Sequence, residues 1–197
     1  MSEARQQVRE LVTRARSGEV EAFEMLYQMH QAGIFTFIRS QVRQAELAAD
    51  LTQDTFVRAW ESLPKLRDEN AFRSWLHSIA SNLIRDEMKS GRARLELLES
   101  AWHEENGSVR PEQPTSDRNG PEQITLAQEA NRELWEALGA LPTEQRAALV
   151  MHHLEGMSVK EIAAAMKVRP GTIMSRLARA REALRQRLRG RVEGQDE

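Results

Sequence analysis

The sequence contains no cysteine, a single tyrosine, and only ten glycines and six prolines among its 197 residues. Without cysteine the chain can build neither a disulfide framework nor a thiolate metal site, which is typical of proteins in a reducing cytoplasm. It also lacks any apolar run close to the roughly 20 residues of a membrane-spanning helix. The first residues, MSEARQQVRE, contain no apolar signal core. We therefore expect a cytoplasmic protein without membrane insertion of its own.

Residues that favour helices, chiefly Ala, Leu, Glu, Arg and Gln, dominate the sequence. In the first half of the chain, apolar side chains at helical spacing predict helices over about 3–16, 20–44, 46–63 and 68–90. Gly33 is expected to bend or break the second of these helices, and Asp68 to cap the fourth. Four helices with short connections predict a compact bundle.

A polar segment at 103–121, HEENGSVRPEQPTSDRNGP, carries proline and glycine and has the composition of a linker. Helical periodicity returns after it, with helices expected over about 121–141, 143–155, 158–166 and 172–188. We therefore predict an all-α protein of two small helical domains joined by a flexible linker. The predicted parts are a domain at 1–95, an acidic linker at 96–121, a domain at 122–190 and a tail at 191–197.

The formal net charge of −2 hides two segments of opposite sign. Residues 96–129 contain eight acidic and two basic side chains, whereas residues 157–191 contain ten basic and two acidic ones. A clustered basic segment is the electrostatic signature of a nucleic-acid-binding domain. We therefore assign the basic charge to a DNA-binding domain and the acidic charge to the linker.

The basic segment also has the pattern of a helix-turn-helix. Ser158 and Glu161 fit a capping box at the start of a short helix, and a turn at 167–171 leads into a longer helix. On that last helix the apolar side chains share one face, and the opposite face carries Thr172, Ser175, Arg176 and Arg179. Hydroxyls and arginines suit base edges and phosphates in the major groove. A basic helix alone is more often a solvated surface, so the prediction depends on the whole combination.

The stretch LPTEQRAALVMHHLEGMSVKEIAAAMKVRPGTIMSRLARAREALRQRL at 141–188 resembles the C-terminal promoter-binding domain of bacterial sigma factors, most closely over GTIMSRLARAR. The resemblance implies that the last helix reads the minus-thirty-five promoter element through Thr172, Met174, Ser175, Arg176, Ala178 and Arg179. The sequence departs from the family pattern in two places. Proline stands directly before Gly171 rather than two residues earlier, and Met174 stands where lysine or arginine is common. Both departures could alter promoter preference.

The segment DLTQDTFVRAW at 50–60 resembles the sigma-factor segment that docks on a coiled coil of the largest polymerase subunit. Asp50, Gln53 and Asp54 recur at helical spacing and share one face, where acceptors suit arginines of a partner. The resemblance implies that these three residues bind RNA polymerase, although the spacing alone is more typical of a solvated acidic face. Phe56 and Trp60 are expected in the bundle core.

The segment FRSWLHSIASNLIRDEMKSGRAR at 72–94 is similar to the promoter-melting region of the same family. The resemblance implies that Asn82 and the loop at 66–71 hold a base flipped from the minus-ten element. A capture pocket is needed, because each unstacked base costs a few kcal/mol. Basic side chains that can contact phosphates follow along the chain: Arg85, Lys89, Arg92 and Arg94. Trp75 lies on an apolar stripe and is expected to pack in the core.

Because the extra domains of housekeeping sigma factors are missing, the chain resembles the extracytoplasmic-function (ECF) group. The resemblance implies three partners, core RNA polymerase, promoter DNA and an inhibitory anti-sigma factor, and no cofactor. Promoter elements about 20 base pairs apart lie roughly 70 Å apart. A flexible coil of about 25 residues averages only about 30 Å, but it reaches about 80–90 Å when extended. The linker would therefore be stretched on the polymerase.

Two alternatives stay open at this point. The first is a helix-turn-helix regulator that acts without core polymerase. The second is an enzyme, for which the sequence offers no paired carboxylates, nucleophile motif or phosphate-binding loop. The adjacent His152 and His153 do not predict a metal site, because neighbouring residues on a helix diverge by about 100° and no third ligand is near in sequence.

Overall fold

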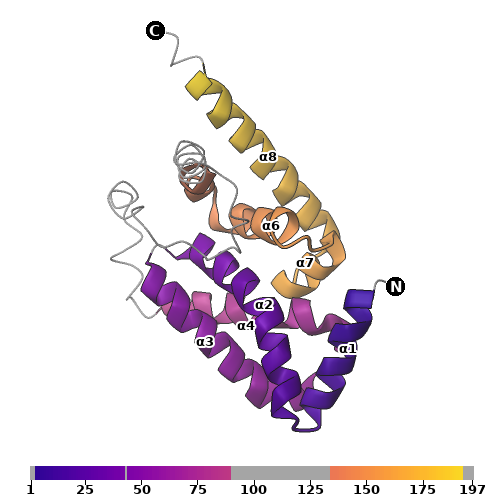
Figure 1. Ribbon diagram of the computed structural model, residues 1–197. Coiled ribbons are helices and arrows are strands. Elements are labelled where there is room, and N and C mark those ends of the chain that lie inside the picture. The colour runs from indigo at the N-terminus through magenta and orange to yellow at the C-terminus, as the bar shows by residue number, and fades with distance from the viewer. Residues whose placement is uncertain (1–2, 43, 90–133, 193–197) are drawn as a thin grey trace, which may run out of the picture.

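The structure, a computed structural model, describes residues 3–42, 44–89 and 134–192. These residues form helices and short connections, with no strand among them, which confirms the predicted all-α fold. Figure 1 shows an N-terminal group and a C-terminal group of helices that lie against each other. Within the described ranges, no helix combines the length and the apolar character needed to cross a membrane.

The N-terminal group consists of α1 (Glu3–Arg16), α2 (Val20–Gln41), α3 (Ala45–Ser62) and α4 (Phe72–Lys89). Gly18 turns the chain between α1 and α2 with a φ of 98°, a conformation that suits glycine. Two short 3-10 turns, η1 (Leu63–Lys65) and η2 (Glu69–Ala71), connect α3 to α4. Asp68 caps η2 instead of α4, because its carboxylate accepts a hydrogen bond from the Asn70 N–H at 3.0 Å.

The core of the N-terminal group is built from aliphatic and aromatic side chains. Its largest fully buried residues are Leu26, Ile34, Phe37, Ile38, Leu63, Phe72 and Leu76. Phe56 is buried and Trp60 is half-buried, as expected for the bundle interior. Phe23 contacts both, with its ring centroid 6.4 Å from that of Phe56 and 5.0 Å from that of Trp60. Such burial is the main source of stability for a bundle of this kind.

The C-terminal group contains a helical stretch at 134–139, then α6 (Thr143–His153), α7 (Val159–Met166) and α8 (Pro170–Val192). Arg146 is buried in α6, and its Nη1 donates to the Gly139 carbonyl oxygen at 3.1 Å, which satisfies the end of the helical stretch at 134–139. The capping box predicted at Ser158 is present. The Ser158 hydroxyl accepts a hydrogen bond from the Glu161 N–H, and the Ser158 N–H donates to the Glu161 carboxylate at 2.8 Å.

The last helix is longer than the sequence predicts at both ends. α8 begins at Pro170 rather than Thr172, because the fixed φ of proline and its missing N–H suit the first helical position. It continues to Val192, beyond the predicted end at 188. The turn before it starts at Lys167, which adopts a left-handed conformation with a φ of 54°.

The two groups of helices contact each other through α4 on α7 and through α2 on α6 (Figure 1). Arg73 of α4 donates to the main-chain oxygen of Glu155, and its Nη2 lies 3.5 Å from the Glu155 carboxylate. The expected break of the second helix at Gly33 does not occur, because α2 runs through this residue. A Cβ at Gly33 would instead collide with the Glu155 carboxylate, so glycine here permits the close approach of the two groups.

Candidate nucleic-acid interface

The first turns of α8 have one buried and one exposed face. Ile173, Leu177 and Ala180 are buried, and α8 packs on α6 and α7. Of the residues predicted to read DNA, the exposed ones are Met174, Ser175, Ala178 and Arg179. Thr172 is half-buried at the edge of this face, and its carbonyl oxygen accepts from the Ser175 hydroxyl at 2.9 Å. The exposed set lies in the N-terminal part of the helix, the part that contacts base edges in helix-turn-helix proteins.

Arg176 is the exception among the predicted reading residues. Only 20% of its side chain is exposed, and its Nη2 lies 2.8 Å from a carboxylate oxygen of Glu144 in the first turn of α6. Its Nη1 faces the sulfur of Met166, the last residue of α7, at 3.8 Å. The guanidinium therefore points toward the other two helices of the group rather than outward.

α4 carries the described residues that were predicted to contact the minus-ten element. Asn82 is half-buried, and its Oδ1 accepts a hydrogen bond from the Arg85 Nη1 at 3.0 Å. Arg85 and Lys89 are exposed. The structure brings these three residues together on the C-terminal half of α4, whereas Arg92 and Arg94 lie outside the described residues.

The loop before α4 is held against α1. Arg16 donates from Nη1 to the Leu66 carbonyl oxygen at 3.2 Å and pairs with the Glu69 carboxylate at 2.8 Å. Trp75, at the start of α4, is half-buried against the core, and its ring centroid lies 5.9 Å from that of Phe72. The loop is therefore anchored at both of its 3-10 turns, and Trp75 packs as expected.

α3 exposes a polar face formed by Asp50, Gln53 and Asp54, as their spacing predicts. Val57 continues this face one turn later and is also exposed, with an apolar side chain. The sequence did not predict an exposed Val57, because a β-branched residue next to the buried Phe56 resembles another core position. The signal was its spacing of three and four residues from Asp54 and Gln53, which places all of them on one side of a helix.

Two families account for most of the described chain. Residues 26–94 match the family described as Sigma-70 region 2, and residues 131–184 match the one described as Sigma-70, region 4. The RNA polymerase sigma-H factor of Pseudomonas aeruginosa is 31% identical over 179 residues, which cover 91% of this chain and 92% of that protein. The chain belongs to the sigma-70 family.

Other similar proteins indicate which group of sigma-70 factors this chain resembles. The ECF RNA polymerase sigma-E factor of Escherichia coli K12 is 28% identical over 88% of this chain and 90% of its own length. A solved structure of CnrH in complex with the cytosolic domain of CnrY has a TM-score of 0.67 and 26% identity, and the match covers 93% of this chain and 98% of that one. The sigma factor RpoE from Bartonella quintana, in complex with the anti-sigma factor NepR, has a TM-score of 0.63 and 25% identity over 85% and 96% of the two chains. The prediction that this chain is an ECF sigma factor is confirmed.

In this sigma factor, several buried titratable groups lie around Arg73. Burial raises the pKa of Glu155, and the nearby Arg73 guanidinium opposes that shift. Burial, and then the charge of Arg73, lower the pKa of His30 to about 4. Burial also lowers the pKa of His77 to about 4, although its hydrogen bond with the Arg73 carbonyl oxygen opposes the change. No sequence motif pointed to this cluster, because its members come from two helices, α2 and α4, and from the turn after α6.

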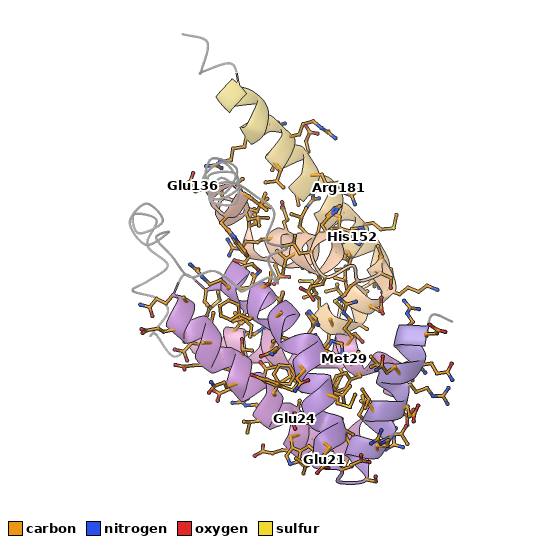
Figure 2. The ribbon with its side chains drawn as sticks, in the orientation of Figure 1. Glu21, Glu24, Met29, Glu136, His152 and Arg181 are labelled. Carbon is orange, nitrogen blue, oxygen red and sulfur yellow. The ribbon has the colours of Figure 1, made fainter. Side chains whose placement is uncertain are left out.

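In the histidine pair of region 4, His152 contacts the connection between α6 and α7, and His153 contacts α8. His152 Nδ1 lies 2.9 Å from the Met157 carbonyl oxygen, and His153 Nε2 lies 3.4 Å from the Nε of Arg181 on α8. Figure 2 shows His152 on α6 with Arg181 on the neighbouring helix. Burial, with the charges of His152 and Arg181, lowers the pKa of His153. Among the described residues, no group of three His, Cys, Asp or Glu side chains could hold a metal ion.

Proposed function

We propose that this protein is a cytoplasmic, non-enzymatic sigma factor that binds core RNA polymerase and directs promoter-specific initiation of transcription. One observation carries the proposal. Region 4 exposes Met174, Ser175, Ala178 and Arg179 on the first turns of its last helix, and region 2 of the same chain exposes the polar face of α3. A regulator that needed only DNA would not need region 2, which this chain carries at residues 26–94. The sigma-E and sigma-H relatives support the same assignment.

In this proposal region 4 reads the minus-thirty-five element, and region 2 reads and melts the minus-ten element through Asn82, Arg85 and Lys89, with Arg92 and Arg94 as further phosphate contacts. The linker at 96–121 joins the domains at 1–95 and 122–190. Because the two promoter elements lie roughly 70 Å apart, regions 2 and 4 must separate from the contact of α4 with α7 before both can bind DNA.

We also propose an anti-sigma factor as a partner that holds the protein inactive. The similarity to RpoE of Bartonella quintana in complex with the anti-sigma factor NepR supports this partner. An inhibitor that stabilised the contact between regions 2 and 4 would keep the two DNA-binding surfaces too close together to span a promoter. The test is whether adding the anti-sigma factor raises the fraction of closed molecules, in which regions 2 and 4 are in contact. This fraction is measured through a distance between the two regions.

Core binding is the test that separates a sigma factor from a helix-turn-helix regulator acting alone. Replacing Asp50, Gln53 and Asp54 together with alanine is expected to abolish co-migration with core polymerase, because these residues supply the acceptors of the α3 face. The matched control replaces Glu21 and Glu24 with glutamine, since these exposed residues of α2 precede the region 2 match (Figure 2). If the triple variant still co-migrates with core, or the wild type never does, the regulator becomes the better reading.

A further inference from the structure

Arg176 belongs to the packing stripe of α8 rather than to its exposed face. Ile173, Arg176, Leu177 and Ala180 follow one another at the spacing that places side chains on a single side of a helix. The other three members of this series are buried, and Arg176 is 20% exposed. By comparison, Met174 is 63% exposed. A charged residue is tolerated on this stripe because its neighbours satisfy the charge.

Two contacts hold the Arg176 side chain in place. Its Nη2 pairs with Glu144, which stands in the first turn of α6, and its Nη1 lies against the sulfur of Met166 at the end of α7. The first turn of a helix favours a negative charge, so Glu144 is well placed to pair with Arg176. One side chain of α8 thus contacts both of the other helices that support it.

We propose that Arg176 is a positioning residue, which sets the angle of α8 on α6 and α7 through Glu144 and does not itself read bases. The inference rests on the proposed function, because it concerns how the minus-thirty-five element is read. Base reading then falls to Met174, Ser175, Ala178 and Arg179, which are exposed. A small rotation of α8 would move all four of these side chains relative to the groove at once.

Neutralising Glu144 should change DNA affinity in the direction opposite to the one that simple electrostatics predicts. Removing a negative charge from a DNA-binding domain ordinarily strengthens its attraction to phosphates. If Glu144 holds Arg176 in place, Glu144→Gln should instead weaken binding of the assembled holoenzyme to its selected promoter by about two- to fivefold, the range of a partly exposed ion pair. The matched control is Glu182→Gln. Glu182 is 52% exposed, Glu144 is 61% exposed, and each pairs with an arginine of α8. Glu182→Gln should leave affinity unchanged or strengthen it.

A double-mutant cycle and a charge reversal complete the test. The promoter is chosen with the wild-type holoenzyme, and affinity is measured on it and on variants with single base-pair changes upstream. Arg176→Ala should lower the ratio of specific to non-specific affinity without relaxing preference at one base pair, and adding Glu144→Gln should cause no further loss. Arg176→Glu should lose more than about tenfold, and adding Glu144→Arg should recover part of that loss, as two contacting charges require.

Amide hydrogen exchange of the free protein decides the inference without DNA or polymerase. Arg176→Ala and Glu144→Gln should both speed exchange in the first turns of α8, and Glu182→Gln should not. Three results would overturn the inference. They are unchanged exchange in both variants, relaxed preference at a single base pair in Arg176→Ala, and a loss of promoter affinity in the Arg176→Ala, Glu144→Gln double variant equal to the product of the two single losses. A wild-type holoenzyme that selects no promoter would refute the proposed function instead, while the exchange result would still decide the role of Arg176.

Discussion

Removing the Arg73 guanidinium should open the contact between regions 2 and 4. In the closed arrangement 31% of the Arg73 side chain and 11% of the Glu155 side chain are exposed. Arg73→Ala leaves Glu155 beneath region 2 without its cation and also removes the donor to the Glu155 carbonyl oxygen. Exposed ion pairs contribute about 0.2–1 kcal/mol, whereas breaking a fully buried pair costs about 3–5 kcal/mol. This pair lies between those limits, so we expect a loss of about 1–3 kcal/mol.

Such a loss changes the ratio of closed to open molecules by about 5- to 150-fold. The absence of cysteine makes the measurement direct, because two cysteines introduced at exposed positions, Glu24 on α2 and Glu182 on α8, can carry a fluorescent donor and acceptor without competing thiols. Energy transfer should fall in Arg73→Ala. It should fall less in Gly33→Ala, because the new Cβ displaces only the Glu155 carboxylate, the far end of a flexible side chain.

The same interface supplies a control. Arg5 pairs with Glu161 across the two groups of helices at 3.9 Å, but the Arg5 side chain is largely exposed. Arg5→Ala should therefore leave energy transfer almost unchanged. If Arg73→Ala kept the wild-type transfer efficiency, or Arg5→Ala lowered it as much, the Arg73–Glu155 contact would not be what holds the regions together.

Three further predictions test other parts of the structure. Lowering the pH from 7 to 5 should reduce the free energy of unfolding by about 2 kcal/mol for each of His30 and His77. Their pKa of about 4 in the folded protein lies below the value of about 6.5 in the unfolded chain, so protonation favours unfolding. A His77→Gln variant with the wild-type pH dependence would contradict this. Ser158→Ala should cost region 4 about 1 kcal/mol in a denaturant titration by removing the capping hydroxyl, and an unchanged midpoint would mean that the capping box contributes nothing. Val57→Lys should weaken binding to core polymerase at least tenfold without changing the melting temperature, since Val57 is exposed, and unchanged core affinity would remove it from the α3 face.

The helix-turn-helix could be predicted from the sequence because its determinants are local. The capping box of Ser158 and Glu161 needs only four consecutive residues, and it forms as expected. The buried series Ile173, Leu177 and Ala180 follows from helical spacing and apolar character alone.

Arg176 shows where this reasoning stops. Its polar character placed it on the reading face, although helical spacing also aligns it with the buried Ile173 and Leu177. Only the approach of Glu144 and Met166, from two other helices, determines which way the side chain points.

Gly33 illustrates the same limit for long-range contacts. Glycine in a helix predicts a break when only its neighbours are considered. The reason for glycine at this position is Glu155, a residue of the other half of the chain whose carboxylate occupies the space of a side chain. Contacts of this kind depend on how two domains dock, and no local pattern around residue 33, 73 or 155 announces them.

In the proposed function, this chain brings core RNA polymerase to a promoter through two surfaces, the face of α3 and the exposed face of α8. Run-off transcription with purified core enzyme on a library of promoter sequences tests it most directly. We expect transcripts that start at defined sites only when the protein is present. The upstream preference should change in Arg179→Ala, and the transcripts should disappear when Asp50, Gln53 and Asp54 are replaced together. Transcription that is the same with and without the protein, while the protein still binds DNA, would contradict it.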